Sequence, residues 1–148
     1  MKVVIISVGK EKDSVMQDAV RHFELRVLRY LPIEWDYVSH EPTKEKEGIK
    51  ILDRLKKEDY VVLLDERGQE LKSEAFAELM ENRMVDGVKR MVFVIGGSYG
   101  VSADVHKRAN YTWKLSPLVF PHMLVRLIVI EQLYRAMTIL QGEQYHHS

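Results

Sequence analysis

The chain has 148 residues, which is enough for one domain with its own hydrophobic core. Its formal net charge of +0 excludes an overall basic surplus, so any surface that binds nucleic acid must be a local one. No run approaches the roughly 18 to 20 apolar residues of a membrane helix, and no membrane partner is expected. The absence of cysteine excludes disulfides and thiolate chemistry, and it suits a cytoplasmic location.

Strands and helices alternate along the first part of the chain. The β-branched run Lys2–Val8 predicts a strand buried on both faces and not a secretory signal, because no cleavage site follows it. Asp13 and Ser14 predict the N-terminus of a helix that ends before Pro32. Residues Ile33–Val38 predict a second strand, and a polar loop then leads into a helix that contains Ile51.

The same alternation continues to the C-terminus. Three more strands are predicted from apolar runs, at Tyr60–Leu64, Met91–Ile95 and Tyr111–Leu115. Three more helices are predicted, at Ser73–Met84 with Ser73 as its cap, at Ser102 to about Ala109, and at His122 to about Leu140. We therefore expect an α/β fold, a single domain over residues 1–148 with a mostly parallel sheet flanked by helices.

Ligands of open α/β sheets bind beyond the carboxyl ends of the strands, which makes three segments candidates for a binding site. They are Leu64–Gly68, Gly96–Gly100 and Leu115–Phe120. Adjacent glycines in the second segment permit positive φ angles and close approach of a ligand to the backbone, although a tight turn has the same pattern. The segment matches neither the dinucleotide fingerprint G-x-G-x-x-G nor a P-loop, which removes most of the support for NAD or ATP chemistry.

The apolar run Met123–Ile130 predicts a helix that is buried on more than one side. In so small a chain a second copy would supply the second side, so we expect a homodimer. Arg126 interrupts this run, and a buried guanidinium is costly unless it meets a carboxylate, backbone carbonyls, a ligand or a partner chain. Arg135 lies four residues after Glu131, a spacing that predicts a structural ion pair.

Six histidines offer titratable groups for acid–base chemistry, although a lone histidine is more often a surface or structural residue. His122 stands at the head of the long helix, one turn before Arg126 and on the same face. His146 lies beside Tyr145 in a terminal segment that would normally fray. No metal site is expected, because no Asp or Glu stands at ligand spacing from a histidine.

Four motifs, VIGGSYG, LSPLVFPH, RLIVIEQLYRA and GEQYHH, occur in this order and resemble the ribosomal RNA large subunit methyltransferase H family. That family belongs to the SPOUT class and methylates N3 of a pseudouridine in 23S ribosomal RNA with S-adenosyl-L-methionine. The resemblance runs from Met1 to His147 and implies a homodimer with a C-terminal trefoil knot. Ordinary topology rules alone favour an unknotted doubly wound sheet.

The resemblance also implies which residues bind the methyl donor. The family's donor contacts carry over to Leu64, Gly96, Leu115, Ser116, Pro117, Leu118, Val119 and Phe120. Backbone amides and carbonyls between apolar side chains are suited to holding adenine. For the target base we expect Tyr145 and His146 to lie nearest, with Arg126 or His122 in support as catalytic residues.

Two other interpretations remain open. A non-catalytic dimer that binds the ribosome could share the fold, although intact donor loops favour the enzyme. A small α/β hydrolase is set aside, because no G-x-S-x-G elbow is present. For RNA binding we expect a basic face that combines Arg21, Arg26 and Arg29 with residues 106–108, with a solvated mixed-charge surface as the alternative. Because the chain is neutral, binding to the assembled ribosome through shape and protein contacts is also expected.

Overall fold

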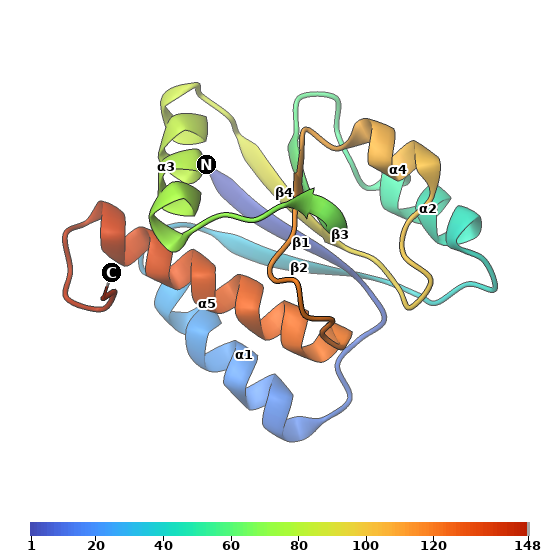
Figure 1. The fold of residues 1–148 in the computed structure, drawn as a ribbon, viewed down its shortest axis with the longest axis horizontal. Coiled ribbons are helices and arrows are strands. Elements are labelled where there is room, and N and C mark those ends of the chain that lie inside the picture. Colours follow the sequence, from blue (N-terminus) through green and yellow to red (C-terminus); the bar gives the residue numbers. More distant parts are fainter. Residues whose placement is uncertain (148) are drawn as a thin grey trace.

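A computed structural model describes residues 1–147, which form one parallel sheet with the strand order β2-β1-β4-β3-β5 (Figure 1). The strands are Lys2–Val8 (β1), Ile33–Val38 (β2), Tyr60–Gln69 (β3), Arg90–Ile95 (β4) and Tyr111–Trp113 (β5). The helices are Ser14–Val27 (α1), Lys44–Asp53 (α2), Ser73–Val85 (α3), Ala103–Arg108 (α4) and His122–Leu140 (α5). The α/β fold with a parallel sheet is confirmed; Ser148, the end of the predicted domain, lies outside the described residues.

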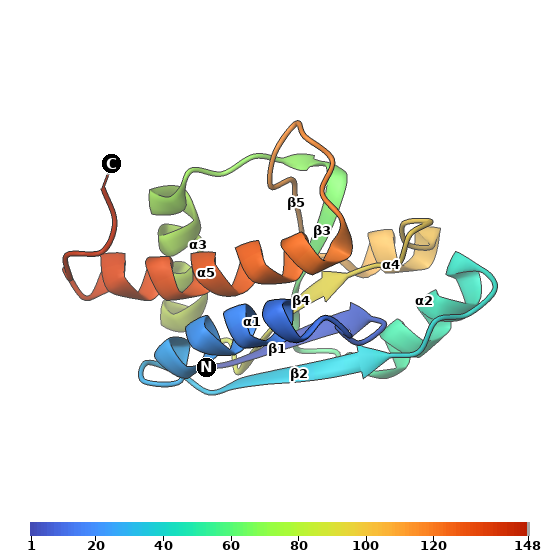
Figure 2. The ribbon, with the colours of Figure 1, turned by 90° about the horizontal axis from the view of Figure 1, so that it is seen from below.

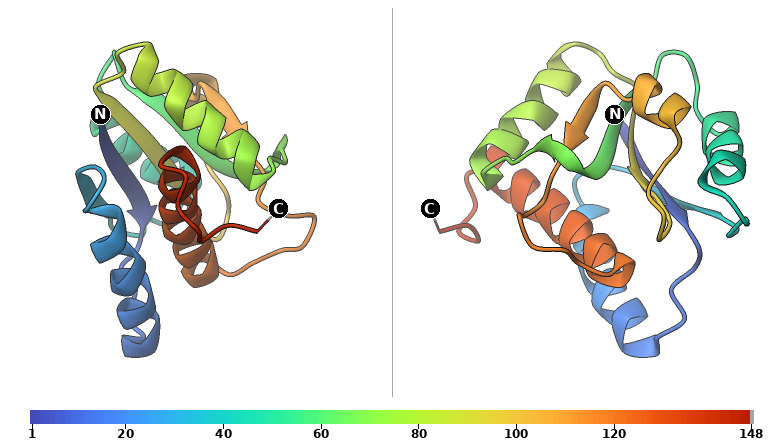
Figure 3. Two further views of the ribbon diagram at one scale, coloured as in Figure 1. Left: turned by 90° about the vertical axis from the view of Figure 1, so that its left-hand side faces the viewer. Right: turned by 45° about the vertical axis from the view of Figure 1, so that its right-hand side comes forward.

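The sheet separates two layers of helices. Helices α1, α3 and α5 cover one face, and α2 and α4 cover the other (Figures 2 and 3). The larger core lies under the three helices and contains Phe76 stacked on Trp113, with ring centroids 4.4 Å apart. The central strands β1 and β4 are buried on both faces, which explains their uninterrupted apolar sequences. Over residues 1–147, no helix combines the length and hydropathy that a membrane crossing requires.

The predicted ends of two strands differ from the observed ones. Strand β3 does not stop at Leu64 but resumes at Gln69, and both of these residues pair with Trp113 of β5. Residues 65–68 therefore form a bulge that leaves the ladder and returns to it. Strand β5 ends at Trp113, two residues before the predicted end. A register irregularity of this kind depends on the partner strand and leaves no periodic signal in the sequence.

Helix capping follows the sequence in two helices and departs from it in a third. The carboxylate of Asp13 accepts hydrogen bonds from the first turn of α1, and the hydroxyl of Ser102 accepts one from Val105 in α4. The prediction that Ser73 caps α3 is wrong, since the cap residue is Lys72. The Ser73 hydroxyl instead donates to Oε1 of Gln132 at 2.7 Å, which ties α3 to α5.

Helix α5 is buried on more than one side, as its apolar run predicts, but α1 and α3 of the same chain supply neighbours on both flanks (Figure 2). Its buried residues include Arg126, Val129, Ile130 and Leu133. Apolar side chains remain exposed at its N-terminal end, at Met123 and Leu124. Much of the burial that the apolar run predicts is therefore supplied within the chain.

The predicted basic face that joins Arg21, Arg26 and Arg29 to residues 106–108 is wrong. The arginines lie on α1 and residues 106–108 lie on α4, and these helices cover opposite faces of the sheet (Figure 3). The Arg108 guanidinium also donates to the backbone carbonyls of Lys56 and Asp59 at 2.8 and 3.0 Å. The two groups of basic residues therefore do not form one continuous surface.

Replacing Gly68 by alanine should destabilise the fold through the junction of β3 and β5. A Cβ atom at this position would lie 2.4 Å from the carbonyl oxygen of Thr112 and 2.8 Å from the backbone nitrogen of Trp113. Both of these atoms belong to the backbone of the paired strand, which has little room to move. We expect Gly68→Ala to lower the free energy of unfolding by about 1–3 kcal/mol in urea titrations. Gln69→Ala, at an exposed neighbouring position, is the control, and an equal loss in both variants would contradict the explanation.

Candidate functional site

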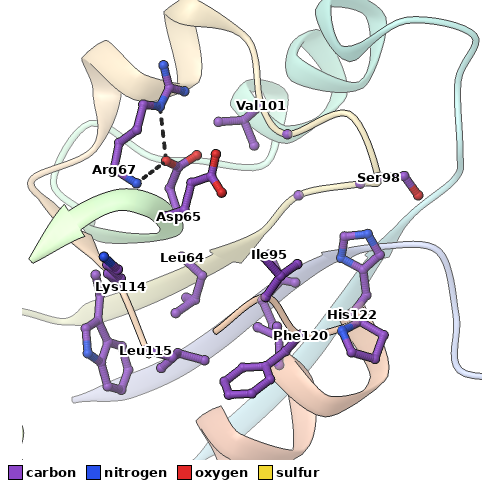
Figure 4. A pocket seen from close by; sticks show the side chains of 18 of the residues that line it. Leu64, Asp65, Arg67, Ile95, Ser98, Val101, Lys114, Leu115, Phe120 and His122 are labelled. Carbon is purple, nitrogen blue, oxygen red and sulfur yellow. Dashed lines mark hydrogen bonds and ion pairs between the residues drawn. The ribbon is translucent and has the colours of Figure 1, made fainter. Parts of the chain in front are cut away.

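A cavity of about 1080 Å³ opens at the carboxyl ends of β3, β4 and β5 (Figure 4). All eight residues that the family resemblance implies as donor contacts line it: Leu64, Gly96 and Leu115–Phe120. His122 lines it as well, whereas Arg126, Tyr145 and His146 do not. Three segments that are far apart in the sequence thus converge on one cavity.

The position of the cavity follows from the topology of the sheet. Parallel strands all present their carboxyl ends at one edge, and the neighbours β3 and β4 lead to helices on opposite faces, α3 and α4 (Figure 2). The two connections therefore diverge and leave a space between them. The segment after β5 then passes across this edge to reach α5, and it closes one side of the space (Figure 1).

The Gly96–Gly100 segment forms a tight turn along one wall of the cavity. The Gly100 N–H donates to the Gly97 carbonyl at 3.0 Å, and positive φ occurs at Gly100 but not at the adjacent glycines. A Cβ at Gly96 would lie 2.6 Å from Cγ1 of Val101, and a Cβ at Gly97 would lie 2.8 Å from Oε1 of Glu47. Close packing, and not positive φ, therefore requires the paired glycines.

The Leu115–Phe120 segment forms the opposite wall. Its turn is fixed by the Ser116 hydroxyl, which accepts a hydrogen bond from the Leu118 N–H at 3.0 Å. Phe120 and Leu115 point into the cavity beside Leu64 and Ile95, so the middle of the cavity is apolar (Figure 4). Leu118 and Val119 are 70% and 87% exposed and lie at the rim.

Five charged residues also line the cavity, three of them on the bulge of β3. They are Asp65, Glu66, Arg67, Lys44 and Lys114. Burial acts to raise the pKa of Asp65, but hydrogen bonds from the backbone and guanidinium of Arg67 outweigh it and hold that pKa below its usual range. The sequence places Asp65 and Arg67 at a strand end but gives no signal for Lys44, which enters from α2.

His122 lies at the end of the cavity nearest α5 (Figure 4). Burial, together with the positive charge of Arg126 and the neighbouring His40, lowers the pKa of His122. The imidazole is therefore neutral near pH 7 and has one nitrogen with a free lone pair. A neutral imidazole in this position has the chemistry of a proton acceptor.

Arg126 finds all its partners within the chain. Its Nε donates to the Ser7 hydroxyl at 2.7 Å, and its Nη2 donates to the carbonyls of Val8 and Gly9 at 3.1 and 2.7 Å. Its Nη1 lies 3.3 Å from Oε2 of Glu11. The carboxylate and the row of carbonyls expected from sequence are both present, and they join α5 to the connection between β1 and α1.

Tyr145 and His146 dock against the C-terminal half of α5 and do not fray. The Tyr145 hydroxyl donates to Oε1 of Glu131 at 3.1 Å, and the Arg135 guanidinium stacks over its ring. Arg135 also forms the predicted pair with Glu131 at 2.7 Å and contacts Nδ1 of His146 at 3.0 Å. His146 reaches Glu74 of α3 with its other nitrogen. This end of α5 lies away from the cavity (Figure 1).

The cavity suits a ligand with a flat apolar part and a polar part. Backbone amides and carbonyls of the turn and loop lie between apolar side chains, an arrangement that can hold a heteroaromatic base. The bulge of β3 adds charged side chains, Asp65, Glu66 and Arg67, to the lining. Among residues 1–147, no three His, Asp or Glu side chains come close enough together to hold a metal ion.

Comparison with known proteins shows the family to which this chain belongs. The sequence model of the family described as "Predicted SPOUT methyltransferase" matches residues 1–146. The chain belongs to the SPOUT methyltransferase family. This confirms the family resemblance and the assignment of the chain as a methyltransferase.

Several relatives are similar to this chain over nearly its whole length. Proteins named "Ribosomal RNA large subunit methyltransferase H" from Parabacteroides distasonis and Desulfitobacterium hafniense are 42% and 36% identical to it, and each alignment covers 99% of both chains. The protein of that name from Porphyromonas gingivalis is 41% identical, again over 99% of both chains.

A solved structure, that of a probable methylase family protein from Haemophilus influenzae, shares the fold of the methyltransferase. The TM-score is 0.55 and the sequence identity is 8%. The match covers 95% of this chain and 66% of that one. At this identity the likeness concerns the fold alone.

Replacing Arg126 by methionine should destabilise the protein, because it leaves Glu11 and two carbonyls without their donor. We expect the free energy of unfolding in urea to fall by about 3 kcal/mol. Arg21→Met is the control, since the Arg21 side chain is 68% exposed, and it should change stability by less than about 0.5 kcal/mol. A similar small change in both variants would show that the network contributes little.

Proposed function

We propose that the protein is an S-adenosyl-L-methionine-dependent methyltransferase that acts on N3 of a pseudouridine in 23S ribosomal RNA. The observation that carries the proposal is the cavity, which all eight residues of the expected donor site line. The full-length relatives support the choice of ribosomal RNA, because their printed names include it. The assembled ribosome, in the cytoplasm, is the proposed substrate.

The donor occupies the cavity between the turn at Gly96–Gly100 and the segment Leu115–Phe120. Backbone groups of these segments bind the adenine ring, and the side chains of Leu64, Leu115 and Phe120 pack on its faces. When bound, S-adenosyl-L-methionine supplies an electrophilic methyl group on a sulfonium. The protein's remaining tasks are to align the target base with that group and to accept the N3 proton.

The target site requires a second copy of the chain in this proposal. Tyr145 and His146 are the residues expected nearest the base, yet they lie at the far end of α5 from the cavity (Figure 1). A helix of 19 residues is about 28 Å long, so the tail of one chain does not serve its own cavity. A homodimer that brings the tail of one copy to the cavity of the other resolves this separation.

An exposed apolar rim supports the homodimer. Leu118, Val119, Met123 and Leu124 are all exposed at the cavity mouth and at the start of α5. Apolar side chains that are exposed together on neighbouring segments are typical of surfaces that bind another protein. His122 is the proposed proton acceptor in support of the tail, and Arg126 supports His122 by fixing the β1–α1 connection. The trefoil knot stays a prediction.

Donor binding and methyl transfer test the proposal. Isothermal titration with S-adenosyl-L-methionine should give saturable heat and a rise in melting temperature. Ribosomes from a strain that lacks the gene should then accept a labelled methyl group, and mass spectrometry of 23S RNA should locate it on N3 of a pseudouridine. Absence of heat and of a thermal shift would instead favour the alternative, a non-catalytic dimer that binds the ribosome.

Deleting Gln144–Ser148 should abolish methyl transfer while leaving the affinity for S-adenosyl-L-methionine unchanged. The reason is that the tail is expected to serve the target base, whereas none of its described residues, 144–147, lines the cavity that holds the donor. Removal of Ser148 alone is the control and should leave transfer intact. Full methylation by the variant that lacks Gln144–Ser148 would rule out a role of the tail at the target base.

A further inference from the structure

The bulge of β3 holds a carboxylate at the cavity that neither the sequence motifs nor the comparisons assign to any task. Asp65 follows Leu64 directly, and both line the cavity. Only about 10% of its side chain is exposed. Figure 4 shows Asp65 on the side of the apolar centre opposite Phe120.

One oxygen of this carboxylate is occupied and the other is available. Oδ1 of Asp65 accepts from the Arg67 backbone N–H at 2.8 Å and from the Arg67 Nε at 3.1 Å. Oδ2 lies 3.4 Å from Nε2 of His106. The Arg67 guanidinium also contacts that nitrogen. Within residues 1–147, Oδ2 has no donor closer than this imidazole nitrogen, whereas Oδ1 has two closer ones.

An ionised carboxylate that is largely buried needs partners for both of its oxygens. Arg67 fixes the orientation of Asp65 but satisfies only one of them, and the apolar centre of the cavity begins at the adjacent Leu64. A polar donor attached directly to an apolar group in this centre would therefore lie within reach of the second oxygen, Oδ2. In a nucleoside, the group attached to the base is a ribose with two adjacent hydroxyls.

We infer that Asp65 accepts hydrogen bonds from the ribose hydroxyls of the nucleoside that occupies the cavity, with Arg67 as the positioning residue that orients it. The inference rests on the proposed function, because it takes the ligand to be an adenosine derivative. A carboxylate is a strong acceptor for hydroxyl groups and also recognises a ribose diol in dinucleotide-binding folds. Asp65 thus separates ribonucleosides from their deoxy counterparts.

Calorimetry on the full chain with two pairs of ligands tests the inference. The ligands are S-adenosylhomocysteine and 5′-methylthioadenosine, each with its 2′,3′-dideoxy analogue. Asp65→Asn should lower the affinity for both ribose-containing ligands roughly tenfold or more, which is the effect expected from losing a hydrogen bond to a charged group. It should leave the affinities of the two dideoxy analogues unchanged. Glu70→Gln, at an exposed position beyond the bulge, is the control and should change none of the four.

Three results would overturn the inference. Equal weakening of the ribose and dideoxy ligands would mean that Asp65 acts on the cavity as a whole. A lower affinity for S-adenosylhomocysteine alone would show that Asp65 binds the amino group of its amino-acid portion and not the ribose. Unchanged affinity of Asp65→Asn for every ligand would leave Asp65 without a role in binding. By contrast, failure of the unaltered protein to bind S-adenosylhomocysteine would overturn the proposed function itself.

Discussion

The burial of Arg126 is the constraint on which the arrangement of the site depends. A guanidinium that is 6% exposed must have its donors satisfied, and here the partners are the Ser7 hydroxyl, two carbonyls and Glu11, all at the end of β1 or just beyond it. The N-terminal half of α5 is therefore held against the carboxyl edge of the sheet. Because His122 lies one turn earlier on the same helix, this network also sets the position of His122 and of the segment that leads into it.

The cavity is a consequence of parallel strands combined with close backbone packing. Strands β3, β4 and β5 deliver three segments to one edge, and none of these segments is near the others in the sequence. Glycine at positions 96 and 97 lets the turn approach Val101 and Glu47, and a side chain at either position would occupy space that those residues already fill. The bulge after Leu64 adds a charged side to an otherwise apolar space. One cavity therefore offers both apolar side chains and charged groups to a ligand.

The two ends of α5 carry different parts of the proposed reaction. The N-terminal end borders the donor cavity, while the C-terminal end holds Tyr145 and His146 through Glu131 and Arg135. The ion pair predicted from helical spacing thus does more than stabilise the helix, because it also orders the tail. A rigid helix between the two ends keeps them apart, which is why the proposed reaction involves two chains. The apolar rim beside the cavity is available for that contact.

The sequence by itself determined the α/β class, the five strands, the caps at Asp13 and Ser102 and the three strand ends that form the cavity, because periodicity and capping are local properties of a chain. Only the tertiary structure decided the bulge at residues 65–68, the partner of Ser73, the separation of the basic residues of α1 and α4 onto opposite faces, and the docking of the tail. These features depend on strand register and on side chains far away in the sequence. The burial of Arg126 could be inferred from the apolar run around it, but its partners, more than a hundred residues earlier, could not.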